Sequence, residues 1–364
     1  MTQDRRNARM GEIWILGATG RIGRTVTAKL AARDADIVLV GRDGDRLRKT
    51  AADAGAPDAK VLISDSVEHM AAEIGSRRPA VVVNTLGDYA RTATTLARAC
   101  MPGGHYVDLA ADLDALPRLL GLHGEAVEAA STLVTGAGFG VLATEAVVAE
   151  LCRDRPAPVQ VRVDALGSVA MAAGVVGEAF AAAMVDMVTS GGRRYQDGHL
   201  VRTRLGADLR NHTLPDGQTA KSAGAPSGEL LAAQGASGAR NVVVTTGLAP
   251  TSRIVRALLP AFAALLSIPR MRRLAVRQLA RTAVKEAPRP RTHSWGHADI
   301  TWPDGTHREG WLRAGDGMDY TADVLTETAS RLARGEAPAG AYTPAAAFGP
   351  GLATAAGGTF ILDQ

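Results

Sequence analysis

The sequence predicts an α/β fold, a doubly wound parallel sheet joined to a second, α+β domain that contains an antiparallel sheet. A buried apolar run at residues 13–16 feeds a glycine-rich turn, and further short apolar runs follow at the spacing of strand–helix repeats. The middle of the chain carries Asp-Gly signals of two-residue hairpin turns. With 364 residues, the chain has room for two domains and a substantial core.

The glycine-rich turn contains Gly17, Gly20 and Gly23. In this spacing the first glycine permits a tight turn and the second lets backbone N–H groups approach a pyrophosphate. The third lets the next helix pack closely on the strand. Residues 24–32 are predicted to form that helix, because Val26 and Leu30 share one face. The sequence thus predicts a Rossmann-type dinucleotide site made by Gly17, Thr19, Gly20, Arg21, Ile22 and Gly23.

The type of dinucleotide is indicated by the end of the second predicted strand, at residues 37–40. A site selective for NAD usually has an acid there, whereas an arginine stabilises the 2′-phosphate of NADP. Arg42 occupies this place, with Arg46 one helical turn further on, so the expected cofactor is NADPH/NADP. Asp43 leaves an alternative open, since its carboxylate could reach a ribose hydroxyl or cap the following helix.

Further strands are predicted at residues 61–63, 81–83, 106–109 and 133–134. In doubly wound sheets the ligand lies at the carboxyl ends of the strands. We therefore expect additional cofactor contacts from residues that directly follow these runs: Asp65, Asn84, Thr85 and Gly87.

The second domain is predicted from two Asp-Gly hairpin turns, at Asp197-Gly198 and Asp304-Gly305. We assign residues 1–145 and 331–364 to the dinucleotide-binding domain. Residues 146–330 are assigned to an α+β domain for substrate binding and possible homodimer formation.

Composition excludes several function classes. A net charge of +4 is too small and scattered to indicate nucleic-acid binding. Cys100 and Cys152 stand far apart, and His293 and His297 have no third ligand nearby in the sequence, so no metal site is predicted. The polar segment at residues 1–10 does not resemble a signal peptide, so the expected location is cytoplasmic.

The catalytic group is less clearly marked. No tyrosine is followed four residues later by lysine, which excludes the Tyr-Lys dyad of short-chain carbonyl reductases. Tyr89 follows the fourth strand, where the nicotinamide is expected, and is the best-placed proton donor; packing beside the cofactor ring is the alternative. Asp112 could orient a substrate or a water, or cap a helix.

In the stretch at residues 254–283, apolar residues up to Ile268 precede an arginine cluster. Pro260 and Pro269 interrupt this stretch, and its apolar part is too short to span a bilayer. It is expected to be a helical lid with a basic face or a docking surface for an anionic partner. A membrane surface or an acyl carrier protein would dock through Arg270, Arg272 and Arg273.

Several segments together resemble the saccharopine dehydrogenase-like oxidoreductases: residues 17–23, 81–89, 106–109 and 138–140. Residues 315–322 and 341–345 are similar to the tail of the shorter actinobacterial members, the trans-acting enoyl reductases. The resemblance implies an NADP-binding Rossmann domain, a central domain that supplies most of the substrate wall, and a C-terminal segment that packs on the Rossmann core. Asp88 and the pair Ala111-Asp112 depart from the usual family residues.

These observations predict an NADPH-dependent oxidoreductase that reduces a polarised C=C (enoyl) bond of a lipid, polyketide or other secondary-metabolite intermediate, free or tethered to a carrier. An imine (C=N) reductase or a saccharopine-type C–N dehydrogenase is the first alternative. A non-catalytic NADP(H)-sensing protein is the second, because no catalytic acid is evident.

Overall fold

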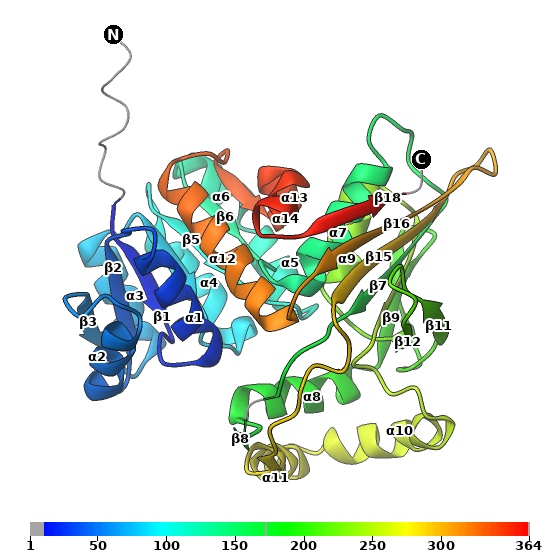
Figure 1. Ribbon diagram of the computed structural model, residues 1–364, viewed down its shortest axis with the longest axis horizontal. Coiled ribbons are helices and arrows are strands. Elements are labelled where there is room, and N and C mark those ends of the chain that lie inside the picture. Colours follow the sequence, from blue (N-terminus) through cyan, green and yellow to red (C-terminus); the bar gives the residue numbers. More distant parts are fainter. Residues whose placement is uncertain (1–10, 172, 363–364) are drawn as a thin grey trace. The chain divides into compact units, whose positions relative to one another are not determined.

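The computed structural model describes residues 11–171 and 173–362, with only the backbone described for residues 178–180. Residues 1–10, the segment that does not resemble a signal peptide, lie outside the described residues. The chain divides into two compact units, whose elements are labelled in Figure 1. The first unit contains residues 11–110, 114–138 and 321–348, and the second contains residues 111–113, 139–320 and 349–362.

The first unit is built on a seven-stranded parallel sheet in the order β17-β6-β5-β4-β1-β2-β3. From β3 to β6 this is the strand order of the classical dinucleotide-binding fold, which confirms the predicted doubly wound sheet. Its strands are β1 (Ile13–Leu16), β2 (Ile37–Gly41), β3 (Lys60–Ile63), β4 (Val81–Asn84), β5 (His105–Asp108), β6 (Thr132–Val134) and β17 (Gly340–Tyr342).

Helices flank this sheet. Apolar side chains of Trp14, Val82 and Tyr106 pack on one face with residues of α3, α4, α5 and α6. Helix α12 is tied to α1 by the ion pair of Lys29 with Asp323, whose N···O distance is 2.6 Å. The helices that carry residues of this unit are α1 (Arg21–Ala31), α2 (Gly44–Asp53), α3 (Val67–Arg77), α4 (Tyr89–Cys100), α5 (Ala115–Leu120), α6 (His123–Glu128), α12 (Gly317–Ala333) and α13 (Pro344–Phe348).

A buried hydrogen-bond network joins the carboxyl ends of β4, β5 and β6. The carboxylate of Asp108, which is fully buried, accepts hydrogen bonds from the Tyr106 hydroxyl at 2.9 Å and from the Thr135 hydroxyl at 2.7 Å. The Asn84 amide donates to the Tyr106 hydroxyl at 2.9 Å. Burial raises the pKa of Asp108 to about 6, although the hydrogen bonds that it accepts oppose the shift.

The second unit is built on a mixed nine-stranded sheet, in which β10-β9-β13-β7-β15-β16-β18 form the main order and β11 and β12 form a side branch. All its neighbouring strands pair antiparallel except β7 and β13, which confirms an α+β domain. The strands are β7 (Gln160–Leu166), β9 (Gly192–Gln196), β10 (His199–Thr203), β11 (Arg210–Thr213), β12 (Thr219–Gly224), β13 (Asn241–Thr246), β15 (Ser294–Thr301), β16 (His307–Ala314) and β18 (Thr359–Leu362).

Both predicted hairpin turns are present in this sheet. Asp197 and Gly198 have φ angles of 51° and 84°, as a two-residue turn between β9 and β10 requires. Asp304 and Gly305 lie in the turn between β15 and β16.

One face of the sheet packs against α7, an apolar helix that is buried along most of its length. Gly296 and Gly310 permit this approach, since a Cβ atom at Gly296 would lie 2.7 Å from the Ala143 side chain. The helices of this unit are α7 (Phe139–Leu151), α8 (Glu178–Ser190), α9 (Glu229–Ser237), α10 (Arg253–Leu266), α11 (Pro269–Ala280) and α14 (Gly351–Ala355). A small separate pair is formed by β8 (Gly174–Val175) and β14 (Ala283–Val284).

A second buried network holds the strands of this unit together around Asp164 on β7. Its carboxylate accepts a hydrogen bond from His297 Nδ1 at 2.7 Å, and His297 Nε2 donates to Glu309 at 2.9 Å. The hydroxyls of Ser222 and Thr245 also donate to Asp164. Burial alone would lower the pKa of His297, but the hydrogen bonds to the two carboxylates outweigh it and raise that pKa.

The unit boundaries differ from the predicted ones in four segments: residues 111–113, 139–145 and 349–362 belong to the second unit, and residues 321–330 belong to the first. The predicted boundary after residue 145 falls inside α7, which belongs wholly to the second unit because its buried faces contact β15 and β16. Residues 331–364 were predicted to belong to the dinucleotide-binding domain, and of these residues 331–348 belong to the first unit. Residues 349–362 belong to the second, because β18 pairs with β16.

The pKa of Asp108 predicts a specific pH dependence of stability. In the unfolded chain this carboxyl releases its proton near pH 4, and in the folded chain only near pH 6. The unfolded state thus binds fewer protons between these values, so the free energy of unfolding falls as the pH rises through this window, by up to ~3 kcal/mol. Asp108→Asn should remove this contribution and make the slope shallower in urea unfolding at stepped pH, while the raised pKa of Glu229 leaves a slope of the same sign.

Asp58→Asn is the matched control, because Asp58 is exposed and its replacement should leave the slope intact. Parallel pH profiles for the wild-type protein and Asp108→Asn would contradict this assignment.

Candidate functional site

The glycine-rich turn after β1 is held in a conformation that needs two of its glycines. Gly17 has a φ of +78°, and a Cβ atom there would lie 2.9 Å from the Thr85 hydroxyl. A Cβ atom at Gly23 would lie 2.4 Å from the carbonyl oxygen of Gly17. The first turn of α1 therefore packs directly on the end of β1, as the sequence predicts.

The opening of α1 is suited to an anion. Gly20 is its N-cap residue and contributes no side-chain cap, and the first turn contains no acid. The N–H groups of Arg21, Ile22 and Gly23 open the helix, where the helix dipole favours negative charge. The turn itself is fixed by Arg24, whose guanidinium donates to the Thr19 carbonyl at 2.7 Å. All six residues predicted to bind the pyrophosphate thus lie in one loop and one helical turn.

The end of β2 carries the residues expected to distinguish NADP from NAD. Asp43 caps α2, because its carboxylate accepts hydrogen bonds from the N–H groups of Asp45 and Arg46, each at 3.1 Å. This leaves Arg42 as the charged side chain directly after the strand. Arg42 is exposed, and within residues 11–171 and 173–362 its side chain makes no ion pair or hydrogen bond.

The predicted contacts after β4 have different roles. Thr85 lies beside the glycine-rich turn, where its hydroxyl donates to the Leu16 carbonyl at 2.7 Å. Gly87 has a φ of +81° in the turn before α4. Asn84 is completely buried, and its side chain bonds Tyr106, Thr92 and the N–H of Leu86. Through these buried hydrogen bonds, Asn84 stabilises the carboxyl edge of the sheet.

The remaining predicted residues are found at strand ends or in loops. Asp65 is exposed after β3. Tyr89 is the first residue of α4 and is half-buried against the core of the first unit. Asp112 is exposed and belongs to the second unit.

Each unit contains a buried carboxyl group to which sequence reasoning assigned no role: Asp108 in the first and Glu229 in the second. Asp108 lies at the end of β5, where the pattern of a polar residue closing an apolar strand marks it. Glu229 lies in the first turn of α9 in the second unit, and its carboxylate would have to move if Gly140 carried a Cβ atom. Burial raises the pKa of Glu229 to about 7. The sequence around Glu229 contains no motif that would have identified it.

The fold also brings together a histidine cluster that the sequence separates. One possible metal-ligand atom each of Asp164, His212 and His297 lies within 4.8 Å of the others. The fold therefore places two possible ligands beside His297, although none lies near it in the sequence. However, Arg162 Nε and Arg210 Nη1 lie 3.5 and 3.9 Å from the Asp164 carboxylate. These guanidinium groups already neutralise the carboxylate and would repel a cation, so the arrangement fits an internal polar network better than a metal site.

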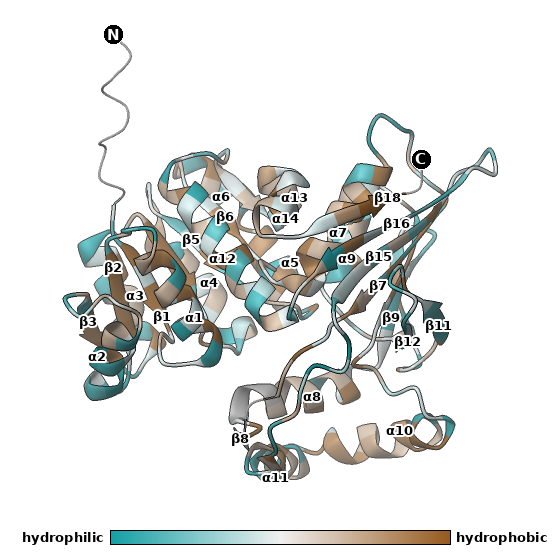
Figure 2. Ribbon diagram, in the orientation of Figure 1, coloured by the Kyte–Doolittle hydropathy of each residue, from teal (hydrophilic) through white to brown (hydrophobic). Residues whose placement is uncertain are grey.

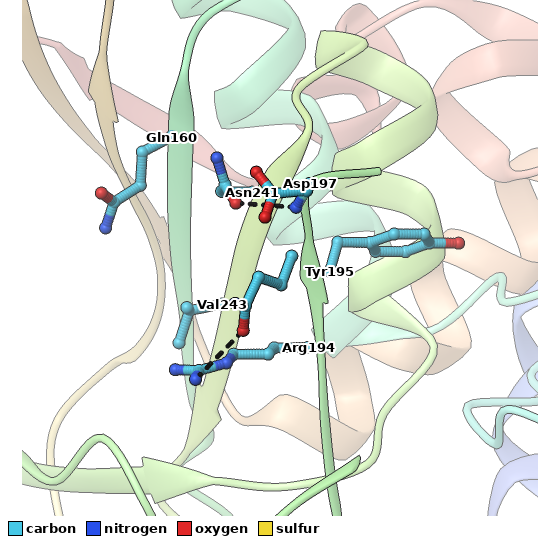
Figure 3. A pocket seen from close by; sticks show the side chains of 7 residues that line it. Gln160, Arg194, Tyr195, Asp197, Asn241 and Val243 are labelled. Carbon is cyan, nitrogen blue, oxygen red and sulfur yellow. Dashed lines mark hydrogen bonds between the residues drawn. The ribbon is translucent and has the colours of Figure 1, made fainter. Parts of the chain in front are cut away.

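The second unit has a hollow of about 330 Å³ on its sheet, lined by residues of β7, β9 and β13 and by the turn after β9 (Figure 3). Most of the residues that line it are of polar types, and the Asn241 side chain accepts a hydrogen bond from the Asp197 N–H at 3.0 Å while the Arg194 guanidinium donates one to Gln196 at 3.4 Å. It contains one arginine and none of the predicted site residues. It therefore does not have the arginine-rich lining that a substrate with several carboxylates requires.

Comparisons with known proteins support the fold. No family model and no curated protein matches the sequence. Among solved structures, the apo form of saccharopine dehydrogenase (L-Glu forming) from Saccharomyces cerevisiae is similar with a TM-score of 0.61 and 13% identity, covering 97% of this chain and 100% of that chain.

Two further structures are similar to about a third of the chain. Serine dehydrogenase from Escherichia coli has a TM-score of 0.29 and 14% identity, covering 34% of this chain and 80% of its own. A metagenomic short-chain oxidoreductase solved in complex with NADP has a TM-score of 0.30 and 18% identity, covering 35% and 80%. The extent of the first similarity shows that this chain has a saccharopine dehydrogenase-like fold over nearly its whole length.

Proposed function

We propose that this protein is an NADPH-dependent oxidoreductase that reduces a polarised C=C bond of an apolar lipid, polyketide or secondary-metabolite intermediate. The observation that carries the proposal is the uncapped opening of α1 beside a glycine-rich turn. Such a helix start supplies N–H donors and a positive dipole for a pyrophosphate. The saccharopine dehydrogenase-like fold and the sequence resemblance agree with this assignment.

The preference for NADPH is supported by the residues after β2. Asp43 caps α2 through its Oδ1 atom, so the cap already accounts for an acid at this position. Arg42 is exposed and has no other partner among the described residues, so its guanidinium is available for a 2′-phosphate.

The proton for this reduction is assigned to a tyrosine. When bound, NADPH would supply the hydride, and the protein would position the acceptor and supply a proton. Tyr89 is the first residue of α4, in the segment that follows the carboxyl end of β4, where the nicotinamide is expected, and we assign it the proton transfer.

Reduction of a C=N bond is the second candidate, and Glu229 favours it. A buried acid that keeps its proton near neutral pH could protonate or bind an imine nitrogen. Asp112 remains a candidate for orienting the substrate in either reaction.

Substitutions at two glycines of the turn, Gly23 and Gly20, test folding and cofactor binding separately. Gly23→Ala should destabilise the protein by at least ~1–3 kcal/mol, because its Cβ would clash with backbone. At Gly20 a Cβ atom would be 3.2 Å from the Gly17 carbonyl oxygen, so Gly20→Ala should fold but block the pyrophosphate. Thermal unfolding and titration followed by NADPH fluorescence measure the two effects.

Gly75→Ala on α3 is the control, since its Cβ would meet open space. NADPH affinity unchanged in Gly20→Ala would place the cofactor elsewhere.

Arg42→Ala tests the cofactor preference. Losing a charge-assisted hydrogen bond to the 2′-phosphate should weaken NADPH binding about 10- to 100-fold and leave NADH binding unchanged. Isothermal titration calorimetry with both nucleotides measures this, and Arg153→Ala, which removes an exposed arginine from the second unit, is the control. An equal loss for both nucleotides would count against NADPH selectivity.

The reaction class is tested with NADPH deuterated at the transferred position and three substrate sets: α,β-unsaturated thioesters, cyclic imines, and 2-oxo acids with an amine. We expect deuterium on the β-carbon of the thioester. Deuterium only in products from the imine or oxo-acid sets would assign C=N chemistry. Tight NADPH binding with no transfer to any set would favour a sensing protein.

A further inference from the structure

The bent helix pair formed by α10 and α11 has the character of an interfacial element. We refer to residues 253–281 as the α10–α11 surface. The chain bends by 116° between the two helices, and both pack against α8. Leu259 and Val276 are the residues of α10 and α11 that are buried, so most of both helices faces outward.

Helix α10 exposes an apolar stripe. Ile254, Leu258, Phe262 and Leu265 recur every three or four residues, which places them on one face of the helix. Their exposed fractions are 74%, 50%, 52% and 44%, which is unusual for large apolar side chains that share a face. Figure 2 shows hydrophobic colours along much of α10. Other exposed apolar residues of this surface are Val255, Ile268 and Leu274.

The same surface is strongly basic. Residues 253–281 contain seven arginines and no aspartate, glutamate or lysine. Arg270, Arg273, Arg277 and Arg281 are exposed and spaced three or four residues apart, so they share one side of α11. Among the described residues, none of these four pairs with a carboxylate.

Arg272 has a different role. Its guanidinium makes two hydrogen bonds to the Asp186 carboxylate on α8, at 2.9 and 2.8 Å. Arg272 therefore links α11 to α8. Of the three arginines expected from the sequence to dock a partner, Arg270 and Arg273 remain available. Arg277 and Arg281 lie on the same side of α11 and join them.

We propose that the α10–α11 surface binds the interface of an anionic lipid bilayer, with the apolar stripe of α10 inserted among the lipids and the arginines of α11 against the headgroups. An apolar face next to clustered arginines is the pattern of helices that lie in a membrane interface. In the described part of the chain no single helix is long and apolar enough to cross a bilayer, and α10 and α11 reach that length and composition only together, as a bent pair. Membrane binding would bring the protein to apolar substrates, which goes beyond the proposed reaction.

Two other occupants fit less well. A second copy of the chain related by a two-fold axis would bring the same arginines of both copies together without acids to balance them. An acidic carrier protein would balance the arginines of α11 but would not account for the apolar stripe on α10. A bilayer with anionic headgroups satisfies both features.

The test is flotation of the full-length protein with vesicles of phosphatidylcholine alone or mixed equally with phosphatidylglycerol. We expect binding to the anionic vesicles that weakens with salt. The triple variant Arg270→Glu, Arg273→Glu, Arg277→Glu should bind at least about 100-fold more weakly, since each arginine near an anionic surface contributes about fivefold. Leu258→Ser with Phe262→Ser should also abolish flotation.

Matched controls are Arg202→Glu, Arg204→Glu, Arg313→Glu for charge and Leu200→Ser for exposed apolar area; both should float like the wild type. No flotation of the wild-type protein would overturn the proposal, as would equal flotation of the arginine variant.

A dimer in solution that the Leu258→Ser, Phe262→Ser variant dissociates would instead assign the surface to a second copy and overturn the proposal. So would binding to an acidic carrier protein with no binding to vesicles. The measurement needs no cofactor, so its failure is distinguishable from a failure to bind NADPH.

Discussion

The site depends on one close approach, that of the first turn of α1 to the end of β1. Gly23 leaves no room for a side chain against the Gly17 carbonyl, and Gly17 leaves none against Thr85. This contact fixes where the helix starts, and with it the direction of its free N–H groups. Thr85 extends the constraint to β4, because its hydroxyl and N–H both donate to the carbonyl of Leu16. In the proposed function, the backbone therefore determines where the pyrophosphate binds, and Arg42 determines which dinucleotide is preferred.

The two units use polar burial in similar ways. In the first, Asp108 gathers donors from β5 and from the residues that follow β5 and β6. In the second, Asp164 gathers donors from β12, β13 and β15. Loss of a donor from either network would destabilise the fold, because a buried carboxylate that lacks its hydrogen-bond donors has lost its solvation by water and gains no interaction in return. Both networks thereby favour one register of the strands around them.

Much of the fold could be predicted from the sequence, because its signals are local. Apolar runs such as residues 13–16 and turns such as Asp197-Gly198 need only their neighbours to be interpreted. The dinucleotide loop is equally local. The assignment of residues 349–362 was not, since β18 pairs with a strand about fifty residues earlier. His297 and Asp164 are 133 residues apart, and Glu229 meets Gly140 only through the packing of α9 on α7. Such contacts depend on tertiary structure that periodicity does not encode.

The central claim is that α1 and Arg42 together hold a phosphorylated dinucleotide. A crystal structure of the protein soaked with NADP tests it most directly. We expect the pyrophosphate against the N–H groups of residues 21–23 and the 2′-phosphate beside the Arg42 guanidinium. A dinucleotide bound elsewhere, or an adenosine ribose turned away from Arg42, would contradict the account.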